Sequence, residues 1–394
     1  MAQVLEGIRV IDFCRYIAGP FCTAMLADLG AEVIRIEKLA GSEDRYTSPI
    51  TDEGEGAGFM QMNRNKKSIT LNPMKPEGRE IVRKLVATAD IVAANLPPPT
   101  LVAMGIDYES LKAVKPDIIL TTMNAFGAGG PYSERVGFDG IGQVMSGGVY
   151  LGGTPEQPVK SFTPYADYGT ASLATVGTLA ALMYRNQTGR GQVVEGALLR
   201  TAVAFNNVAM IEQAAIERNR VGTLNRLQTA APGDIYKTRD GWVIAQVIGQ
   251  NLFERWARIM GEEHWLTDPR FKDDASRGDN NAPINTRMAQ WCAERTTEEV
   301  ITLMEEARVP CGPVLSPAQT LEDPHVRAVG MLQEVEYPGL PRPVPIADFP
   351  VRLSESPGGI RRRAPTLGEH TDEVLAELGY TQGQVAELRE RRVV

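Results

Sequence analysis

The sequence has few cysteines and histidines, and it contains no long apolar run. Its four cysteines form no Cys-x-x-Cys pair, which excludes the usual zinc and disulfide frameworks and favours a reducing, cytoplasmic compartment. Only three histidines occur, all far from the glycine-rich Gly127–Gly130, and we expect each to have a surface or packing role. No metal site is predicted. The residues concerned are Cys14, Cys22, Cys292, Cys311, His264, His325 and His370.

Signals for a membrane or for nucleic acid are also missing. Residues 1–6 have neither the basic nor the apolar region of a signal peptide. No apolar stretch reaches the roughly eighteen residues of a spanning helix. The formal net charge is −8, so no excess of Lys and Arg is available to neutralise nucleic acid phosphates. We expect a soluble protein in which any anionic ligand is bound by a local basic patch.

Three common catalytic or nucleotide-binding motifs are absent. The sequence has no G-x-x-x-x-G-K-[ST] loop and no G-x-S-x-G elbow, which argues against a P-loop nucleotidase and a serine hydrolase. The turn after the first predicted strand reads Ala18-Gly19-Pro20 instead of G-x-G-x-x-G, so NAD is not indicated.

Short apolar runs alternate with helical patterns in the first half of the chain. Helices are expected at Glu77–Thr88, from about Tyr168 to Asn186, and at Leu199–Arg218. This alternation predicts an α/β fold in which helices cover both faces of a mostly parallel sheet. The strands are expected at Ile8–Phe13, Glu32–Ile36, Ser68–Leu71, Asp90–Ala94, Ile118–Met123 and Gln192–Glu195.

A chain of 394 residues predicts two domains. Residues 219–232 lack periodicity and are interpreted as a linker. A β-hairpin with an Asp240-Gly241 turn follows. We therefore predict a smaller α+β domain over 219–330, and a large domain over 1–218 that is completed by 331–394.

A carboxylate stands where the long central helix begins. Asp167 lies in Tyr165-Ala166-Asp167-Tyr168-Gly169. Aspartate is a favoured N-cap residue, so a purely structural role is one interpretation. The other is a reactive carboxylate that the helix N-terminus keeps ionised, with backbone N–H groups available to an oxyanion.

Blocks along nearly the whole chain resemble the class III CoA-transferases. This superfamily includes formyl-CoA transferase, carnitine CoA-transferase and α-methylacyl-CoA racemase. The blocks occur in the family's order, and they are Leu5–Phe13, Ala18–Pro20, Leu26–Glu37, Asn63–Ile69, Gly130–Tyr132, Ala166–Tyr168, Arg185–Gln192 and Ala364–Thr371.

The resemblance implies a reaction for Asp167. In the family, the matching aspartate attacks an acyl-CoA thioester and becomes an aspartyl-CoA thioester, from which an acceptor acid takes the CoA. CoA is then a substrate, and no metal or redox cofactor is needed. The resemblance also implies a Rossmann-like large domain and a homodimer of two interlocked rings.

Further residues match CoA-contacting positions of the family. Lys38 follows the second strand, at the edge of the sheet where ligands bind in open α/β folds. The family often has an Arg before Met104, where this chain has Ala103, and Arg64 or Lys66 could replace it. The full set that we expect around CoA is Ile17, Ala18, Lys38, Leu71, Asn72, Asn95, Leu96, Met104 and Arg135.

Two alternatives to CoA transfer remain. A racemase needs two opposed acid/base groups, and family racemases have a His-Asp pair where this chain has Phe138-Asp139. A non-catalytic CoA-binding protein is the second alternative. The acyl donor and the acceptor acid are not predicted, although Tyr165 and Tyr168 could line a site for a quaternary ammonium.

Overall fold

The computed structural model describes residues 3–394, and the chain divides into two compact units. The large unit comprises residues up to Gly147, Ser161–Ile211 and Arg327–Val394. The small unit comprises Gly148–Lys160 and Glu212–Val326. Among residues 3–394, no helix is both long enough and apolar enough to cross a membrane.

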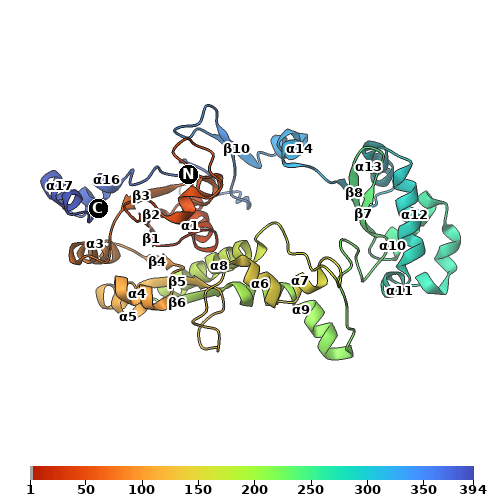
Figure 1. Ribbon diagram of the computed structural model, residues 1–394, viewed down its shortest axis with the longest axis horizontal. Coiled ribbons are helices and arrows are strands. Elements are labelled where there is room, and N and C mark those ends of the chain that lie inside the picture. Colours follow the sequence, from red (N-terminus) through yellow and green to blue (C-terminus); the bar gives the residue numbers. More distant parts are fainter. Residues whose placement is uncertain (1–2) are drawn as a thin grey trace. The chain divides into compact units, whose positions relative to one another are not determined.

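A six-stranded parallel sheet forms the centre of the large unit, which confirms the predicted α/β class. Its strand order is β3-β2-β1-β4-β5-β6, the order of doubly wound nucleotide-binding folds (Figure 1). The strands are β1 (Arg9–Asp12), β2 (Glu32–Glu37), β3 (Lys66–Thr70), β4 (Ile91–Ala94), β5 (Ile119–Asn124) and β6 (Val193–Ala197).

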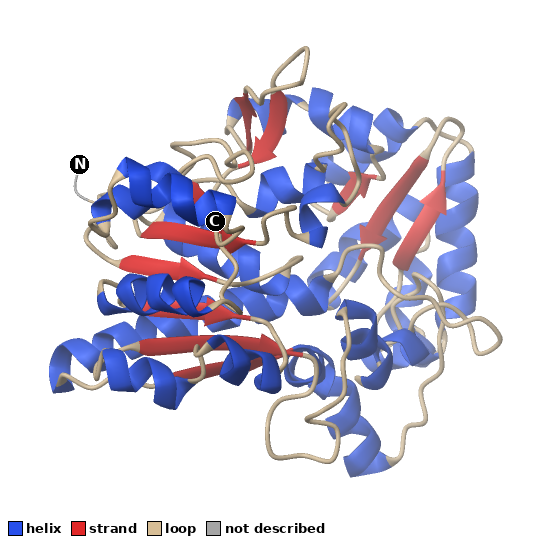
Figure 2. Ribbon diagram, turned by 60° about the vertical axis from the view of Figure 1, so that its left-hand side comes forward, coloured by secondary structure: helices blue, strands red, loops and turns tan. Residues whose placement is uncertain are grey.

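Helices cover both faces of this sheet, as Figure 2 shows. Alternate strand residues point to opposite faces. Val10 packs in one core with α1 and α8, whereas Ile11 packs in a second core with α3, α4, α5, α16 and α17. These helices are α1 (Ala18–Asp28), α3 (Pro76–Ala87), α4 (Pro98–Met104), α5 (Tyr108–Val114), α8 (Tyr165–Thr188), α16 (Thr371–Glu377) and α17 (Gln382–Glu390).

The remaining elements of the large unit are short, apart from α9 (Leu198–Ile216), which continues into the small unit. They are the 3-10 helix η1 (Glu43–Tyr46), α2 (Ala57–Met62), α6 (Asp139–Met145), and the antiparallel pair β10 (Leu332–Val335) and β11 (Val344–Ala347). The segment 337–365 contributes β11 to this pair.

The small unit has an antiparallel sheet, and the predicted hairpin is confirmed. Strands β7 (Gly233–Lys237) and β8 (Trp242–Gln246) flank the Asp240-Gly241 turn. Trp256 is fully buried in the core of this unit, stacked between Phe253 and Trp265. The other elements are α7 (Gly148–Leu151), α10 (Gln250–Met260), η2 (Glu263–Thr267), η3 (Pro269–Phe271), α11 (Asp274–Asp279), α12 (Asn281–Ala293), α13 (Thr297–Glu306), β9 (Cys311–Pro313), α14 (Pro317–Glu322) and α15 (Pro324–Ala328), which crosses the unit boundary.

Candidate active site

A cavity of about 1030 Å³ opens in the large unit at the carboxyl ends of the strands. Open parallel sheets bind ligands at this edge. All ten residues predicted to form the site line this one cavity. They are Ile17, Ala18, Lys38, Leu71, Asn72, Asn95, Leu96, Met104, Arg135 and Asp167.

The turn between β1 and α1 forms one part of the wall, and buried polar groups fix its shape. Asn95 accepts the backbone N–H of Arg15 at 2.7 Å and donates to the Arg15 carbonyl at 2.7 Å. Gly19 packs so closely on Cys14 that a Cβ atom at position 19 would lie 2.4 Å from the Cβ of Cys14. The side-chain amide of Asn95 therefore fixes the backbone of the turn. Glycine is the only residue type that fits at position 19.

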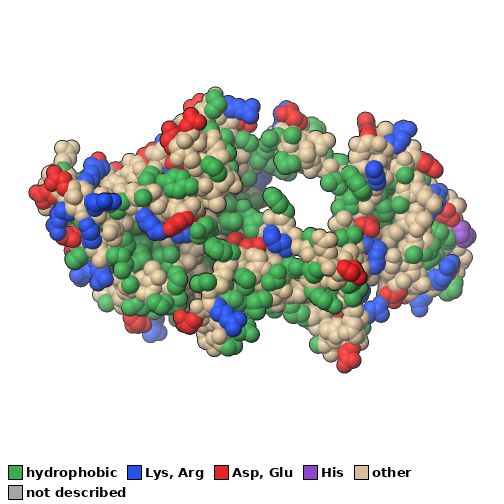
Figure 3. Space-filling view, in the orientation of Figure 1, with side chains coloured by type: hydrophobic (Ala, Val, Ile, Leu, Met, Phe, Trp, Pro, Cys, Tyr) green, Lys and Arg blue, Asp and Glu red, His purple; other side chains and the backbone are tan. Residues whose placement is uncertain are grey.

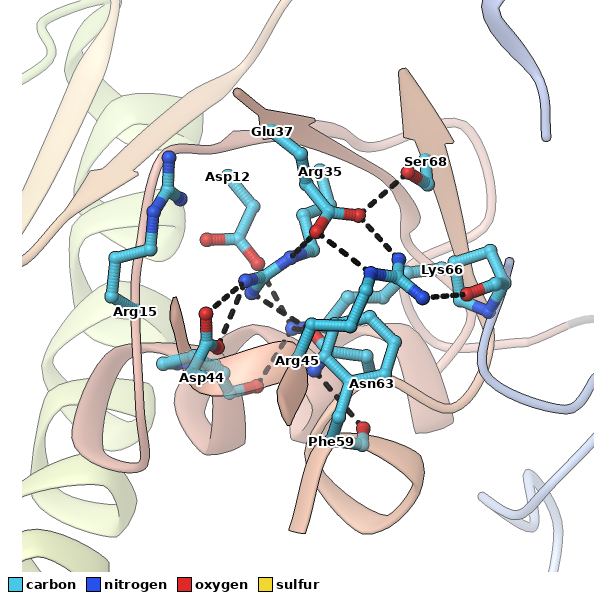
Figure 4. A network of polar contacts seen from close by, with 12 residues as sticks. Asp12, Arg15, Arg35, Glu37, Asp44, Arg45, Phe59, Asn63, Lys66 and Ser68 are labelled. Atoms are coloured by element: carbon cyan, nitrogen blue, oxygen red, sulfur yellow. Dashed lines mark hydrogen bonds and ion pairs between the residues drawn. The ribbon is translucent and has the colours of Figure 1, made fainter. Parts of the chain in front are cut away.

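A network of buried charges lies beneath this turn (Figure 4). Arg35 donates to both carboxylate oxygens of Asp44 at 2.9 and 2.8 Å, and Lys66 donates to Asp12 at 2.9 Å. Burial alone would raise the pKa of Asp12, but the charges of Lys66 and Arg35 lower that pKa to about 2. Asp12 also accepts the N–H of Cys14 at 2.8 Å, which ties the network to the turn.

The prediction that Arg64 or Lys66 could contact a ligand phosphate is wrong. Both side chains are buried outside the cavity wall, with Arg64 paired to Asp28 at 2.6 Å and Lys66 to Asp12. A buried cation needs a buried partner, and these pairs supply one.

Five other basic side chains do line the cavity. Lys38 pairs with Glu43, and the guanidinium of Arg135 lies 4.0 Å from the ring centre of Tyr132. The others are Arg15, Lys75 and Arg392, none of which was predicted as a site residue. The cavity thus has the local basic patch that an anionic ligand requires in an acidic protein.

Asp167 is the third residue of α8, and it lies half-buried on the cavity wall. Its burial, and then the negative charge of Asp139, raise the pKa of Asp167 from 3.8 to about 7. Strongly raised pKa values in a cleft are typical of reactive carboxyl groups.

The N-cap interpretation of Asp167 is wrong, because a different carboxylate caps α8. Asp139, the first residue of α6, accepts the backbone N–H groups of Ala166 at 2.9 Å and of Asp167 at 3.2 Å. Its other oxygen accepts from Gln143 at 2.5 Å, and the residue is almost fully buried. This cap also explains why α8 begins at Tyr165 and not at Tyr168.

The predicted oxyanion site at the start of α8 is also wrong. The N–H of Tyr165 bonds to Thr163, and that of Tyr168 bonds to Pro164, so each N–H of the first turn already has a partner. The carboxylate of Asp139 occupies the position where a negative ligand would be stabilised. The helix therefore does not keep Asp167 ionised, in agreement with its raised pKa.

Aromatic side chains narrow the cavity near Asp139. Tyr16 and Phe138 both line it, and their rings meet edge to face at 5.3 Å. Tyr165 and Tyr168 lie outside the cavity wall, where Tyr168 packs edge to face on Phe21. These two tyrosines therefore have packing roles.

Groups that could act as metal ligands are not clustered in the described part of the chain, and Glu43 and Glu134 are the other carboxylates that line the cavity with Asp167. Within residues 3–394, no three His, Cys, Asp or Glu side chains are grouped closely enough to hold a metal ion. None of the three histidines, all of them described, lines the cavity.

Comparisons with known proteins agree on one family. A family described as "CoA-transferase family III" matches residues 5–371. The chain is 34% identical to succinyl-CoA–D-citramalate CoA-transferase of Chloroflexus aurantiacus, over 99% of this chain and 98% of that one. It is 30% identical to formyl-CoA:oxalate CoA-transferase of a Bradyrhizobium species, over 99% and 97% of the two chains.

A solved structure is similar over nearly the same length. A CAIB/BAIF family protein from Brucella suis superimposes with a TM-score of 0.84 at 31% identity, covering 96% of this chain and 100% of that chain.

Proposed function

The chain belongs to CoA-transferase family III, and from this premise we propose that it transfers CoA from an acyl-CoA to a carboxylic acid through a covalent intermediate on Asp167. The observation that carries the proposal is the position of Asp167. Among residues 3–394, it is the one aspartate on the wall of a large cavity whose other lining residues include several cations. CoA transfer of this kind needs a carboxylate next to the thioester of the bound acyl-CoA and cations next to the phosphates of CoA.

The reaction divides into steps that a single carboxylate can carry out. The ionised Asp167 attacks the thioester carbonyl and expels CoA as a thiolate, which leaves a mixed anhydride. The thiolate then attacks the aspartyl carbonyl, releases the donor acid and forms an aspartyl-CoA thioester. The acceptor acid attacks this thioester, and the returning thiolate takes the new acyl group and restores the carboxylate of Asp167.

The burial of Asp167 has two opposite consequences for this reaction. A carboxylate with a raised pKa is a stronger nucleophile, but less of it is ionised at a given pH. Asp139 contributes to the raised pKa while it holds the first turn of α8. We propose that Asp139 positions Asp167 and does not itself react.

Racemization is the second candidate, and the cavity does not favour it. Asp139 would be its acid/base group, yet both oxygens of Asp139 are engaged and the side chain is buried. Its neighbour Phe138 is 66% exposed and has no titratable group. A single half-buried carboxylate suits nucleophilic attack better than two-sided proton transfer.

A trapping experiment tests the proposal. Incubation with acyl-CoA and no acceptor is expected to leave an adduct on Asp167, which hydroxylamine converts to a hydroxamate and borohydride reduces. Mass spectrometry of the peptide around residue 167 locates the adduct, and Asp167→Asn is the matched control. A racemase would form no adduct and would exchange solvent deuterium at the carbon beside the thioester. A CoA-binding protein without activity would do neither.

The relatives guide the choice of substrates. Their names specify succinyl-CoA, formyl-CoA, oxalate and D-citramalate, so we propose small carboxylic acids as acceptors. A screen of carboxylic acids with succinyl-CoA and formyl-CoA as donors would identify the pair.

We further propose a cytoplasmic homodimer. The four free cysteines suit a reducing compartment. Large apolar side chains are exposed on α8 and α9, and Figure 3 shows apolar surface over α6 and α9. Such exposed apolar surface is typical of an interface between copies. The residues are Leu173, Val176, Phe205, Val208 and Ile211.

A further inference from the structure

We infer that Arg392, near the end of the chain, binds the 3′-phosphate of CoA. The inference deepens the proposed function and rests on it for the identity of the ligand. The backbone of Arg392 has a φ of 55°. This left-handed conformation suits glycine and is unfavourable for a residue with a long side chain.

The unusual conformation comes from the way α17 ends. The N–H of Arg392 bonds to the carbonyl of Arg389 at 2.9 Å, and the N–H of Val393 bonds to that of Leu388 at 2.8 Å. This pair of bonds is the Schellman motif, whose left-handed position is usually occupied by glycine. An arginine at this position costs folding free energy, but it is not by itself a sign of function, since Arg308 ends α13 with the same motif at a φ of 56°. What distinguishes Arg392 is that its side chain lies on the cavity wall, where that of Arg308 does not.

The segment Arg391–Val394 is held firmly beside the cavity. Val393 and Val394 are buried in the core that contains Met104 of α4. The carbonyl of Val393 accepts the N–H of Asn72 at 2.7 Å, in the loop that follows β3. The backbone around Arg392 is therefore fixed, although its side chain is exposed on the cavity wall.

The guanidinium of Arg392 is available to a ligand. It makes no hydrogen bond or ion pair with any residue from 3 to 394. Lys75 also lies on the cavity wall, and its ammonium group donates a hydrogen bond to the carbonyl of Arg391. Figure 3 shows further Lys and Arg side chains gathered at this end of the large unit, where Figure 1 places α3, α17 and the C-terminus. An anion bound at this place would contact two adjacent cations, Lys75 and Arg392.

Arg392 lies at the end of the cavity where the phosphate end of a bound CoA is expected. Asp167 belongs to α8, which packs on β5 and β6, whereas Arg392 lies beside the loop after β3. Four strand spacings separate β3 from β5, which amounts to about 19 Å. CoA carries its thiol and its 3′-phosphoadenosine at opposite ends, so a thioester at Asp167 directs the phosphate toward Arg392.

Calorimetric binding of CoA and of 3′-dephospho-CoA tests the inference without using activity. Arg392→Gly removes the guanidinium and relieves the left-handed backbone. We expect the variant to bind CoA about tenfold more weakly, to bind dephospho-CoA as tightly as the wild type does, and to melt at the same or a higher temperature. Arg392→Ala should weaken CoA binding by the same factor, but without the rise in melting temperature that glycine gives.

The matched control is Arg389→Ala. Arg389 lies on the same helix and pairs with Asp372 outside the cavity, so this variant should bind CoA normally. Equal loss of affinity for both ligands, or no loss for either, would overturn the assignment of the 3′-phosphate. A wild-type protein that binds CoA but transfers none would refute the proposed function and leave this inference standing.

Discussion

The raised pKa of Asp167 predicts an unusual pH dependence for a carboxylate nucleophile. At about pH 5, a carboxyl group with a pKa of about 7 is ionised in about 1% of molecules. The same group at its ordinary value of 3.8 would be ionised in about 94%. Because only the ionised form attacks, we expect kcat/KM for an acyl-CoA to fall about a hundredfold between about pH 8 and about pH 5.

The assay is the initial rate of CoA transfer at low acyl-CoA concentration, because kcat/KM reports the ionisation of the free enzyme. CoA affinity, measured by calorimetry over the same range, separates the titration of Asp167 from that of the ligand phosphates. The expected profile has a slope of one on its acidic limb and a midpoint near pH 7. A kcat/KM that stays constant down to about pH 5 would refute the reasoning that burial and Asp139 raise this pKa.

Further expectations concern Asp139, Asp167, Lys38 and the exposed face of α9. Asp139→Asn keeps an oxygen that can cap α8 but removes the charge, so the midpoint of the kcat/KM profile should move to lower pH; an upward shift would contradict this role. The folded state keeps the Asp167 proton to higher pH than the unfolded state, so the contribution of Asp167 to stability should fall as pH rises from about 4 to about 7. Asp167→Asn should therefore be more stable than the wild type by up to about 4 kcal/mol above pH 7 in urea unfolding, and the gain should vanish toward pH 4. Lys38→Ala should raise KM for several acyl-CoA donors by similar factors, whereas an effect on one donor alone would assign Lys38 to the acyl group. Val208 lies on α9 and is 81% exposed, so Val208→Glu should not destabilise the fold. If this face of α9 forms the interface between two copies, the variant should be a monomer in light scattering.

Much of the large unit could be predicted because its signals are local. Buried parallel strands are continuous apolar runs, and each predicted strand of the sheet agrees with an observed one to within two residues at each end. Ligands bind where such strands end, so positions just after them, such as Lys38 and Asn72, were natural site residues. The family resemblance contributed the more specific choices, such as Met104.

The parts that could not be predicted depend on contacts between distant residues. Arg64 is 36 positions from its partner Asp28, and only the fold makes this pair a buried one. Asp139 caps a helix that begins more than twenty residues later. No local pattern distinguishes such a cap from an ordinary first-turn aspartate.

The order in which the sheet acquires its two layers of helices has a consequence during synthesis. Strands β1 to β5 leave the ribosome early, whereas α16 and α17, which cover one face with Val374, Leu375, Val385 and Leu388, come last. At ribosomal speed, tens of seconds separate the two events. Throughout that interval, the nascent chain exposes apolar surface that is later buried in this core. We expect a chaperone to bind this surface. Loss of the last two helices would make this state permanent, so such truncations should aggregate in the cell.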